Sequence, residues 1–118
     1  MKRLFVLAVV FIIIVSLSAC NKNIVRGSIV KQTDEGAAVL DIMPQKLFEI
    51  AEMGDIVVVT VGEFREEMPL VDNVIAEEGK LQLFYDSNEH SLKIFAYNQD
   101  FFEEYNFAIN SKVNIKKQ

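Results

Sequence analysis

The first twenty residues, MKRLFVLAVVFIIIVSLSAC, constrain what this 118-residue chain can fold into more than any other segment. Two cations, Lys2 and Arg3, precede an apolar run from Leu4 to Val15, and small residues follow the run. This layout is typical of a secretory signal, and the run is too short for an ordinary membrane-spanning helix. We expect residues 1–19 to be removed as a signal peptide, which leaves 99 of the 118 residues for the folded protein. About 100 residues support one hydrophobic core, so a two-domain enzyme is excluded.

The end of this segment, Leu17-Ser18-Ala19-Cys20, resembles the lipobox of bacterial lipoproteins. The resemblance implies that a diacylglycerol is attached to the thiol of Cys20 and that the chain is cleaved just before it. Cys20 is the only cysteine, so a disulfide within the chain is excluded. An ordinary secretory signal with a chance cysteine, or an uncleaved anchor, remains the alternative. We expect residues 20–26 to form the lipidated cysteine and a short tether, and residues 27–118 to form a single domain.

The expected location is extracytoplasmic, with the lipid at Cys20 holding the protein on a bacterial membrane. The next residue is Asn21 and not the aspartate associated with inner-membrane retention in enteric bacteria, so both membranes stay open. Without Lys2 and Arg3, ten Lys and Arg stand against 17 Asp and Glu, which makes the net charge −7 instead of −5. Such an acidic domain offers no basic face to nucleic-acid phosphates, and its charge disfavours adhesion to anionic lipid. The expected partners are the membrane and an envelope protein, with no nucleic acid.

Short apolar and alternating runs dominate the remaining sequence and predict strands over 24–32, 37–42, 55–61, 64–68, 80–85, 91–97 and 112–115. Pro44 and Gly54 bracket a helical pattern of about two turns. Asp100 is a predicted N-cap for a helical turn over 101–105, with Glu103 three residues later. Pro69 is expected to mark an edge or the end of its strand. So many short strands favour an all-β fold, a small barrel or a sandwich.

Candidate catalytic residues are few. His90 is the only histidine and stands in a polar turn, where a solvated role is the simpler interpretation. The turn that starts at Asp86 begins like a calcium loop, but Ser91 and Tyr97 stand where glycine and glutamate are required. We therefore expect no metal and no cofactor. Three acidic pairs could serve a small hydrolase, but neighbouring strand residues point to opposite faces, so this function ranks last; the pairs are Glu66-Glu67, Glu77-Glu78 and Glu103-Glu104.

Aromatic residues gather in the last third of the chain and allow two interpretations. They pack the core of a small barrel, which we favour, or they form a platform for a ligand. Phe95 and Tyr97 are the best candidates for the second role. The set comprises Phe84, Tyr85, Phe95, Tyr97, Phe101, Phe102, Tyr105 and Phe107.

The order of short sequence blocks resembles the C-terminal β-barrel domain of the S-adenosylmethionine (SAM) hydroxide adenosyltransferases, the family that includes the SAM-dependent fluorinases and chlorinases. The likeness runs from about Arg26 to Ile115. Its blocks are Gly27-Ser28-Ile29-Val30, 36–42, Gly54-Asp55-Ile56-Val57-Val58-Val59, Met68-Pro69-Leu70-Val71-Asp72, Glu78-Gly79-Lys80-Leu81, Asp86-Ser87, Leu92-Lys93-Ile94 and Lys112-Val113-Asn114-Ile115. The resemblance implies an antiparallel barrel of six or seven strands with one or two short helical turns.

In that family a larger N-terminal domain carries the catalytic aspartate, while the barrel contacts adenine and methionine across a trimer interface. This sequence has the signal where that domain would stand, so the resemblance brings no catalytic residue and we expect a protein that is not an enzyme. Of the family's Asp-x-Phe-Gly-Asn turn only Gly36 survives, and bulky Phe101 and Phe102 replace small alanines. The resemblance therefore implies that the barrel is kept and that the SAM site is lost.

The most favoured function is therefore a lipid-anchored, non-catalytic barrel of the cell envelope that binds a partner protein or a small ligand. The alternative is a residual SAM- or adenosine-binding domain that works with a separate partner. Its candidate ligand-binding residues are Asp41, Asp86, Ser87 and Tyr97.

Overall fold

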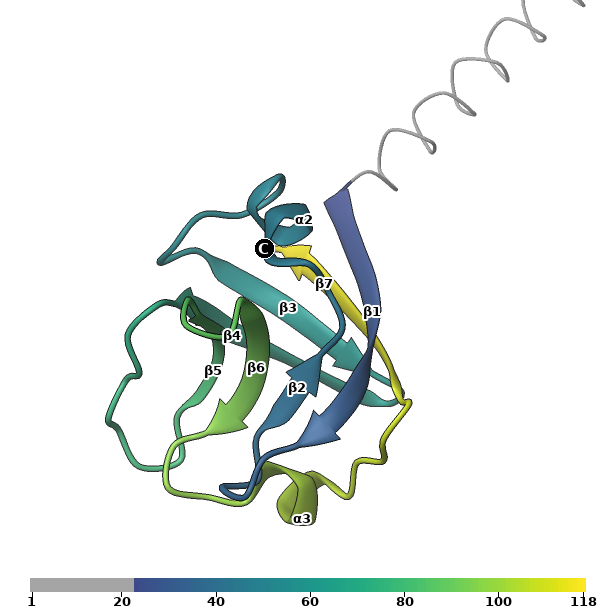
Figure 1. The fold of residues 1–118 in the computed structure, drawn as a ribbon, viewed down its shortest axis with the longest axis vertical. Helices are drawn as coiled ribbons and strands as arrows, with labels where there is room; N and C mark the ends of the chain where they lie inside the picture. The colour runs from purple at the N-terminus through teal and green to yellow at the C-terminus, as the bar shows by residue number, and fades with distance from the viewer. Residues whose placement is uncertain (1–22) are drawn as a thin grey trace, which may run out of the picture.

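A computed structural model describes residues 23–118, and seven strands in it close into a barrel in the order β1-β2-β6-β5-β4-β3-β7 (Figure 1). Two helices of five residues, α2 (Pro44–Phe48) and α3 (Phe101–Tyr105), accompany the barrel. The predicted all-β barrel with short helical turns is confirmed, whereas the predicted signal peptide and Cys20 lie outside the described residues. The strands are β1 (Ile24–Gln32), β2 (Ala38–Leu40), β3 (Ile56–Val61), β4 (Phe64–Val71), β5 (Leu81–Asp86), β6 (Ser91–Ala96) and β7 (Lys112–Lys117).

One strand pair, β4 with β5, is parallel, with Leu70 opposite Leu83 and Val71 opposite Phe84. The other pairs around the barrel are antiparallel. This differs from the expectation of an antiparallel barrel, and the reason is geometric: seven strands in a closed ring cannot alternate in direction all the way round. Parallel neighbours cannot be joined by a tight hairpin. The segment 72–80 makes the longer connection.

Alternating apolar residues fill the barrel. On β3, Val57, Val59 and Val61 are buried, and Leu92 and Ile94 are buried on β6. The residues between them point outwards because successive strand residues face opposite sides. β-branched and other apolar side chains pack well on such a surface, so each strand supplies one face to a common core.

The domain begins earlier than predicted. β1 starts at Ile24, which lies opposite Lys116 of β7, and Arg26 lies opposite Asn114. Residues 24–26, expected in the tether, are therefore part of the barrel, because this stretch completes the ladder with β7. Only Asn21, Lys22 and Asn23 lie between Cys20 and β1 in the sequence.

Two other boundaries differ from the sequence prediction. β4 continues through Pro69 instead of ending there. The N–H of Leu70 donates to the Asp55 carbonyl on the β3 side, so the nitrogen of Pro69 faces the opposite side, where β5 begins to pair only at Leu70. α2 is shorter than two turns and ends at Phe48, although the Ala51 N–H still donates to the Leu47 carbonyl.

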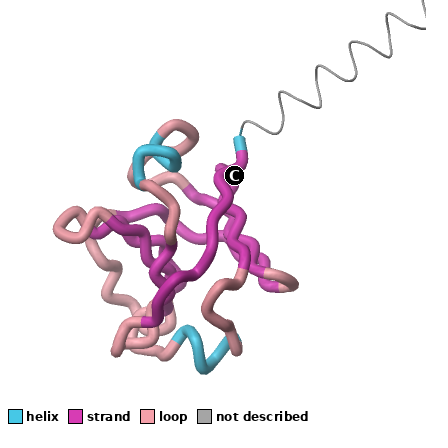
Figure 2. The backbone as a smooth tube through the Cα atoms, turned by 45° about the vertical axis from the view of Figure 1, so that its right-hand side comes forward, coloured by secondary structure: helices cyan, strands magenta, loops and turns pink. Residues whose placement is uncertain are grey.

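The two helices lie at opposite ends of the barrel (Figure 2). At the α3 end, Asp100 Oδ1 accepts a hydrogen bond of 3.0 Å from the Glu103 N–H, which confirms the predicted N-cap. Phe101 is fully buried and stacks on Phe107 at a centroid distance of 4.8 Å. Of the helices in residues 23–118, none has the length and apolar character needed to cross a bilayer.

Candidate binding groove

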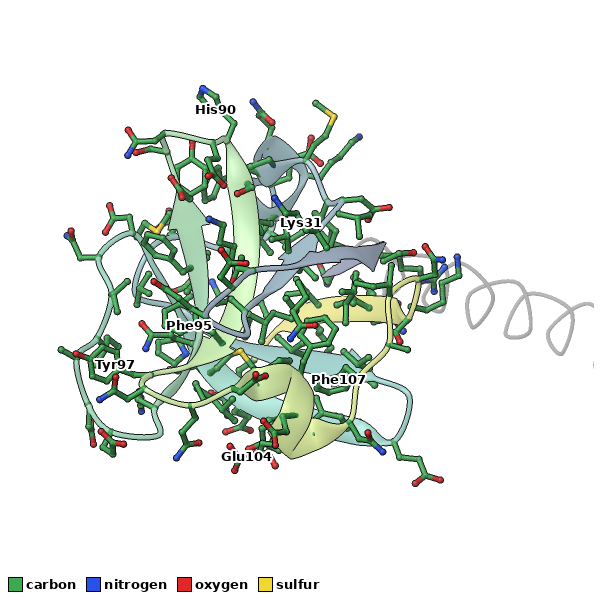
Figure 3. The ribbon with its side chains drawn as sticks, turned by 60° about the horizontal axis from the view of Figure 1, so that its bottom comes forward. Lys31, His90, Phe95, Tyr97, Glu104 and Phe107 are labelled. Atoms are coloured by element: carbon green, nitrogen blue, oxygen red, sulfur yellow. The ribbon has the colours of Figure 1, made fainter. Side chains whose placement is uncertain are left out.

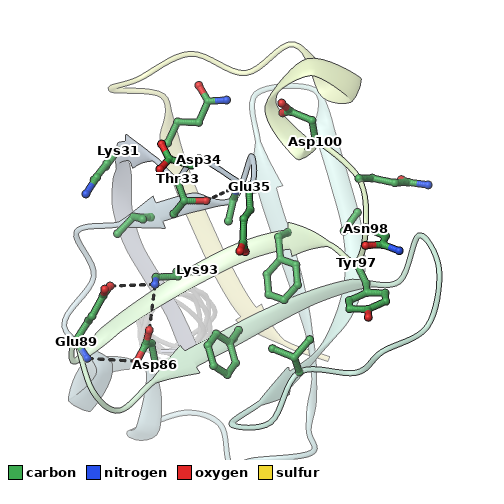
Figure 4. A pocket seen from close by; sticks show the side chains of 18 residues that line it. Lys31, Thr33, Asp34, Glu35, Asp86, Glu89, Lys93, Tyr97, Asn98 and Asp100 are labelled. Atoms are coloured by element: carbon green, nitrogen blue, oxygen red, sulfur yellow. Dashed lines mark hydrogen bonds and ion pairs between the residues drawn. The ribbon is translucent and has the colours of Figure 1, made fainter.

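An open groove of about 1040 Å³ crosses the outer face of β1, β2, β6 and β5 (Figure 4). Its floor is set by strand register. Lys31 lies opposite Val39, Val39 opposite Lys93, and Lys93 opposite Phe84, so one row of side chains crosses four strands. Phe95 lies two residues further along β6 and meets Phe84 edge to face at 6.2 Å. The floor is therefore partly apolar and aromatic.

An ion cluster occupies the end of the groove near the β5–β6 turn (Figure 4). Lys93 Nζ lies 3.0 Å from Asp86 Oδ2 and 2.9 Å from Glu89 Oε2. Asp86 Oδ1 also accepts from the N–H groups of Asn88 and Glu89 at 3.0 and 3.3 Å. The bond from Lys93 and these two N–H groups outweigh partial burial and lower the pKa of Asp86. Partial burial opposes the charge on Lys93, but Glu89 and Asp86 outweigh it and raise its pKa.

The other end of the groove is formed where the turn after β1 meets the turn after β6. Gly36 has φ of +86°, and a Cβ built on it would lie 2.8 Å from the Cα of Asp100. The turn is held by Thr33, whose Oγ1 accepts from the Ala37 N–H at 3.0 Å. Glycine is required at position 36 because of both its left-handed backbone and this close approach.

The connection 72–80 forms part of one wall, and a buried glutamine fixes it. Gln82 is fully buried on the outer side of β5. Its Oε1 accepts from the Ile75 N–H at 2.8 Å, and its Nε2 donates to the carbonyls of Ile75 and Lys80 at 3.1 and 3.2 Å. Val74, which is 43% exposed, faces the groove from this connection. Sequence reasoning missed Gln82, because a polar residue in an alternating strand resembles an ordinary solvated position.

The groove is acidic: five carboxylates and two lysines line it. Lys93 is engaged by two of the carboxylates. Asp34, Glu35 and Asp100 lie on the rim where the two turns meet, and Lys31 is the one remaining lysine that lines the groove. A cation with an apolar portion matches this surface better than an anion does.

Of the four residues proposed from the sequence as ligand contacts, the structure brings two to the groove. Asp86 and Tyr97 line it but lie at its opposite ends, one beside the start of β6 and one just after its last residue. Ser87 and Asp41 are exposed and do not line the groove. Asp41 Oδ1 instead accepts from the Ser28 N–H at 2.6 Å and joins the end of β2 to β1. The four residues therefore do not form one compact site.

The structure separates the aromatic residues of the last third into two groups. Phe101 and Phe102 are buried in the core, and Tyr85, Tyr105 and Phe107 pack against it. Phe84, Phe95 and Tyr97 line the groove, and Figure 3 shows Phe95 and Tyr97 on one side of the barrel, away from Phe107 beside α3. One subset thus packs the core, and the other is placed where a ligand could reach it.

The remaining candidate residues that follow lie outside the groove. His90 is exposed in the β5–β6 turn with φ of +50° and projects from the molecule (Figure 3). Glu66 and Glu67 are exposed on β4, opposite Val59 and Val58. Within residues 23–118, no three His, Cys, Asp or Glu side chains are grouped to hold a metal ion.

Comparison with known proteins gives the fold alone. No family model matches the sequence, and no curated protein does. The barrel is similar to an uncharacterized conserved protein from Thermotoga maritima, with a TM-score of 0.72 and 18% identity over 80% of this chain and 36% of that one. It is also similar to a conserved hypothetical protein from Thermus thermophilus, with a TM-score of 0.56 and 17% identity over 79% of this chain and 34% of that one. The chain thus spans about a third of the length of these two proteins, whose structures contain a domain of the same fold.

Proposed function

We propose that this chain is a lipid-anchored lipoprotein of the bacterial cell envelope, whose barrel is a non-catalytic binding module. The anchor is proposed at Cys20, on the pattern of residues 1–20. The observation that carries the binding role is the groove, where an aromatic floor lies between the Lys93 ion cluster at one end and the acidic rim of Asp34, Glu35 and Asp100 at the other. The ligand that fits this chemistry is a cationic segment with apolar side chains, such as a basic stretch of an envelope protein.

The chemistry of the groove's ionisable groups supports binding more than catalysis. A general base needs a pKa near the working pH and a free position beside its substrate. Asp86 has a lowered pKa and accepts from Lys93 and two backbone N–H groups. Its carboxylate is stabilised as an anion and already engaged, which makes it a weak base and a good structural acceptor.

The anchor is tested by producing the full chain in bacteria that are fed an alkyne-labelled fatty acid. We expect label on the wild-type protein and its recovery with membranes. The matched variant Cys20→Ala is expected to carry no label. Labelling of Cys20→Ala, or unlabelled wild-type protein, would refute the anchor.

The groove is tested with a photo-crosslinking amino acid in place of Phe95, in cells. We expect a discrete cross-linked protein that disappears when Glu35→Lys reverses one rim charge. The control reversal, Glu67→Lys, changes another exposed carboxylate, on β4 and outside the groove lining, and is expected to leave the cross-link intact. Equal loss with both variants would point to bulk charge and not to this groove.

A second candidate function is binding of SAM or adenosine, with a separate partner. The observation in its favour is that Phe84 and Phe95 line the same groove as Asp86 and Tyr97, since aromatic rings and carboxylates attract a sulfonium cation. Titration calorimetry with SAM and with adenosine decides. Heat that is lost in Phe95→Ala would support it, and the absence of heat at millimolar ligand would end it.

A further inference from the structure

Exposed apolar side chains concentrate at the α2 end of the barrel. Among residues 23–118, seven large apolar side chains are more than a third exposed, and four of them fall between positions 43 and 56. Met43 is 62% exposed, and Phe48, Met53 and Ile56 are each 38% exposed. These four residues define the α2-end patch. A small domain does not need to expose so many large side chains in one short segment, so the patch indicates a contact surface.

The patch lies where the chain enters the barrel. Ile24, the first residue of β1, is opposite Lys116, and the Gln118 N–H donates to the Ile56 carbonyl at 3.1 Å. Figure 1 shows α2, the start of β1 and the C-terminus together at one end, with α3 at the other. Three residues separate Cys20 from Ile24, and three extended residues span only about 10 Å. An acyl chain on Cys20 would therefore hold this end against the bilayer.

The charges at this end suit an interfacial position without making it basic. Lys46 and Lys116 are exposed there, while Lys117 Nζ lies 3.4 Å from Asp55 Oδ2. Lysine stems can lie along the apolar boundary while the ammonium stays in water. Glu49 and Glu52 are exposed as well, so attraction to anionic lipid does not carry the contact. Apolar burial does, and a zwitterionic bilayer is sufficient.

We propose that the α2-end patch lies in the membrane interface, with Met43, Phe48 and Met53 in contact with the acyl boundary. This inference rests on the proposed lipid anchor. It fixes the orientation of the barrel: the α3 end, with exposed Glu103 and Glu104, points away from the membrane. The groove then runs up the side of the barrel, and its acidic rim at positions 34, 35 and 100 lies far from the lipid.

The chain has no tryptophan, so the fluorescence of a single introduced tryptophan reports on the surroundings of that position alone. Lipidated Phe48→Trp protein is placed in phosphatidylcholine vesicles that contain lipid brominated on its acyl chains, and lipidated Phe95→Trp, with the indole in the groove, is the matched control. We expect Phe48→Trp to be quenched several-fold more than Phe95→Trp. Met53→Trp gives a second reporter from the same patch, which guards against a local effect of the first.

The outcomes separate this proposal from the anchor. Protein that floats with the vesicles and shows equal, weak quenching of both reporters would overturn the membrane contact and leave the anchor standing. Protein that does not float would overturn both. A Phe48→Trp spectrum that shifts to the blue with protein concentration in lipid-free solution would assign the patch to a second copy of the chain, and would also overturn the proposal.

Discussion

Each end of the barrel carries a helix of five residues, and the two ends differ in how far their large apolar side chains are buried. At the α3 end, Phe64, Phe101 and Phe107 lie within 5.8 Å of one another by ring centroid and contribute to the core. At the α2 end, Met43 and Phe48 are exposed. Only Pro44 and Leu47 of α2 are buried. One end buries its large apolar side chains in the core, and the other leaves several of them exposed.

The N-terminal caps of the two helices also differ. α3 begins with a side-chain cap from Asp100 and ends at Asn106 in the left-handed conformation, with φ of +59°. At the start of α2, Met43 makes no side-chain capping bond. At this position α2 therefore has an exposed apolar side chain instead of a capping bond. This arrangement is unfavourable for the isolated domain unless another surface covers the methionine. The comparison predicts that equal substitutions at the two ends have unequal costs.

The largest difference is expected for phenylalanine truncation. Phe101→Ala should lower the free energy of unfolding by about 3–5 kcal/mol because it leaves a cavity in the core, a large part of what a domain of this size possesses. Phe48→Ala should cost about 1 kcal/mol, since it removes a ring that is 38% exposed and its edge-to-face contact with Tyr85 at 5.2 Å. Urea unfolding followed by circular dichroism measures both. Similar costs at the two ends would contradict the comparison.

Two glycines with left-handed backbones give the next test. Gly36→Ala places a methyl group against the backbone of Asp100, whereas Gly54 (φ of +92°) has nothing within 4 Å of its ideal Cβ. Both substitutions force an alanine into the left-handed conformation, which lowers the free energy of unfolding by about 1–2 kcal/mol. Gly36→Ala should lose about 1–3 kcal/mol more through overpacking. Equal shifts in the urea midpoint would contradict the close approach of Gly36 to Asp100.

Substitutions at the two N-cap positions are expected to change the stability less, and in opposite directions. Asp100→Ala removes the bond to the Glu103 N–H and should cost about 1 kcal/mol. Met43→Asp introduces a cap where the backbone is already extended, with φ of −66° and ψ of 126°, and should stabilise the lipid-free domain by up to about 1 kcal/mol. Thermal unfolding of both variants checks the signs. A destabilising Met43→Asp would mean that the methionine contributes to packing despite its exposure.

The strands and the α3 cap could be predicted from the sequence because their signals are local. Alternation on β6 and the Asp100 to Glu103 spacing act within a few residues. The parallel β4–β5 pair could not, since it follows from closing seven strands into a ring. Gln82 was missed for a related reason: its role depends on the connection 72–80 folding back over β5.

Some residues of the groove could be predicted from the sequence, but their arrangement could not. Tyr97 and Phe95 were singled out because aromatic residues late in the chain had no certain place in the core. The row from Lys31 to Phe84 depends on register across four strands, which local patterns do not specify. Asp41 was proposed from a family resemblance, and the structure gives it a backbone contact to Ser28 instead.

The smallest effect concerns pH and belongs to the α2 end. Asp55 accepts from the Glu52 N–H at 2.8 Å and lies near Lys117, and these contacts lower its pKa below the ordinary value of 3.8 despite partial burial. A lowered carboxyl pKa means that the ionised form stabilises the fold above pH 3.8, and that this contribution is lost as the pH falls through the folded-state pKa. Asp55→Asn should therefore be less stable than wild type at neutral pH, and the difference should shrink in acid. Urea unfolding across this range measures the difference, with Glu49→Gln, an exposed carboxylate on the same end, as the control. A difference independent of pH would show that Asp55 acts through shape and not through its charge.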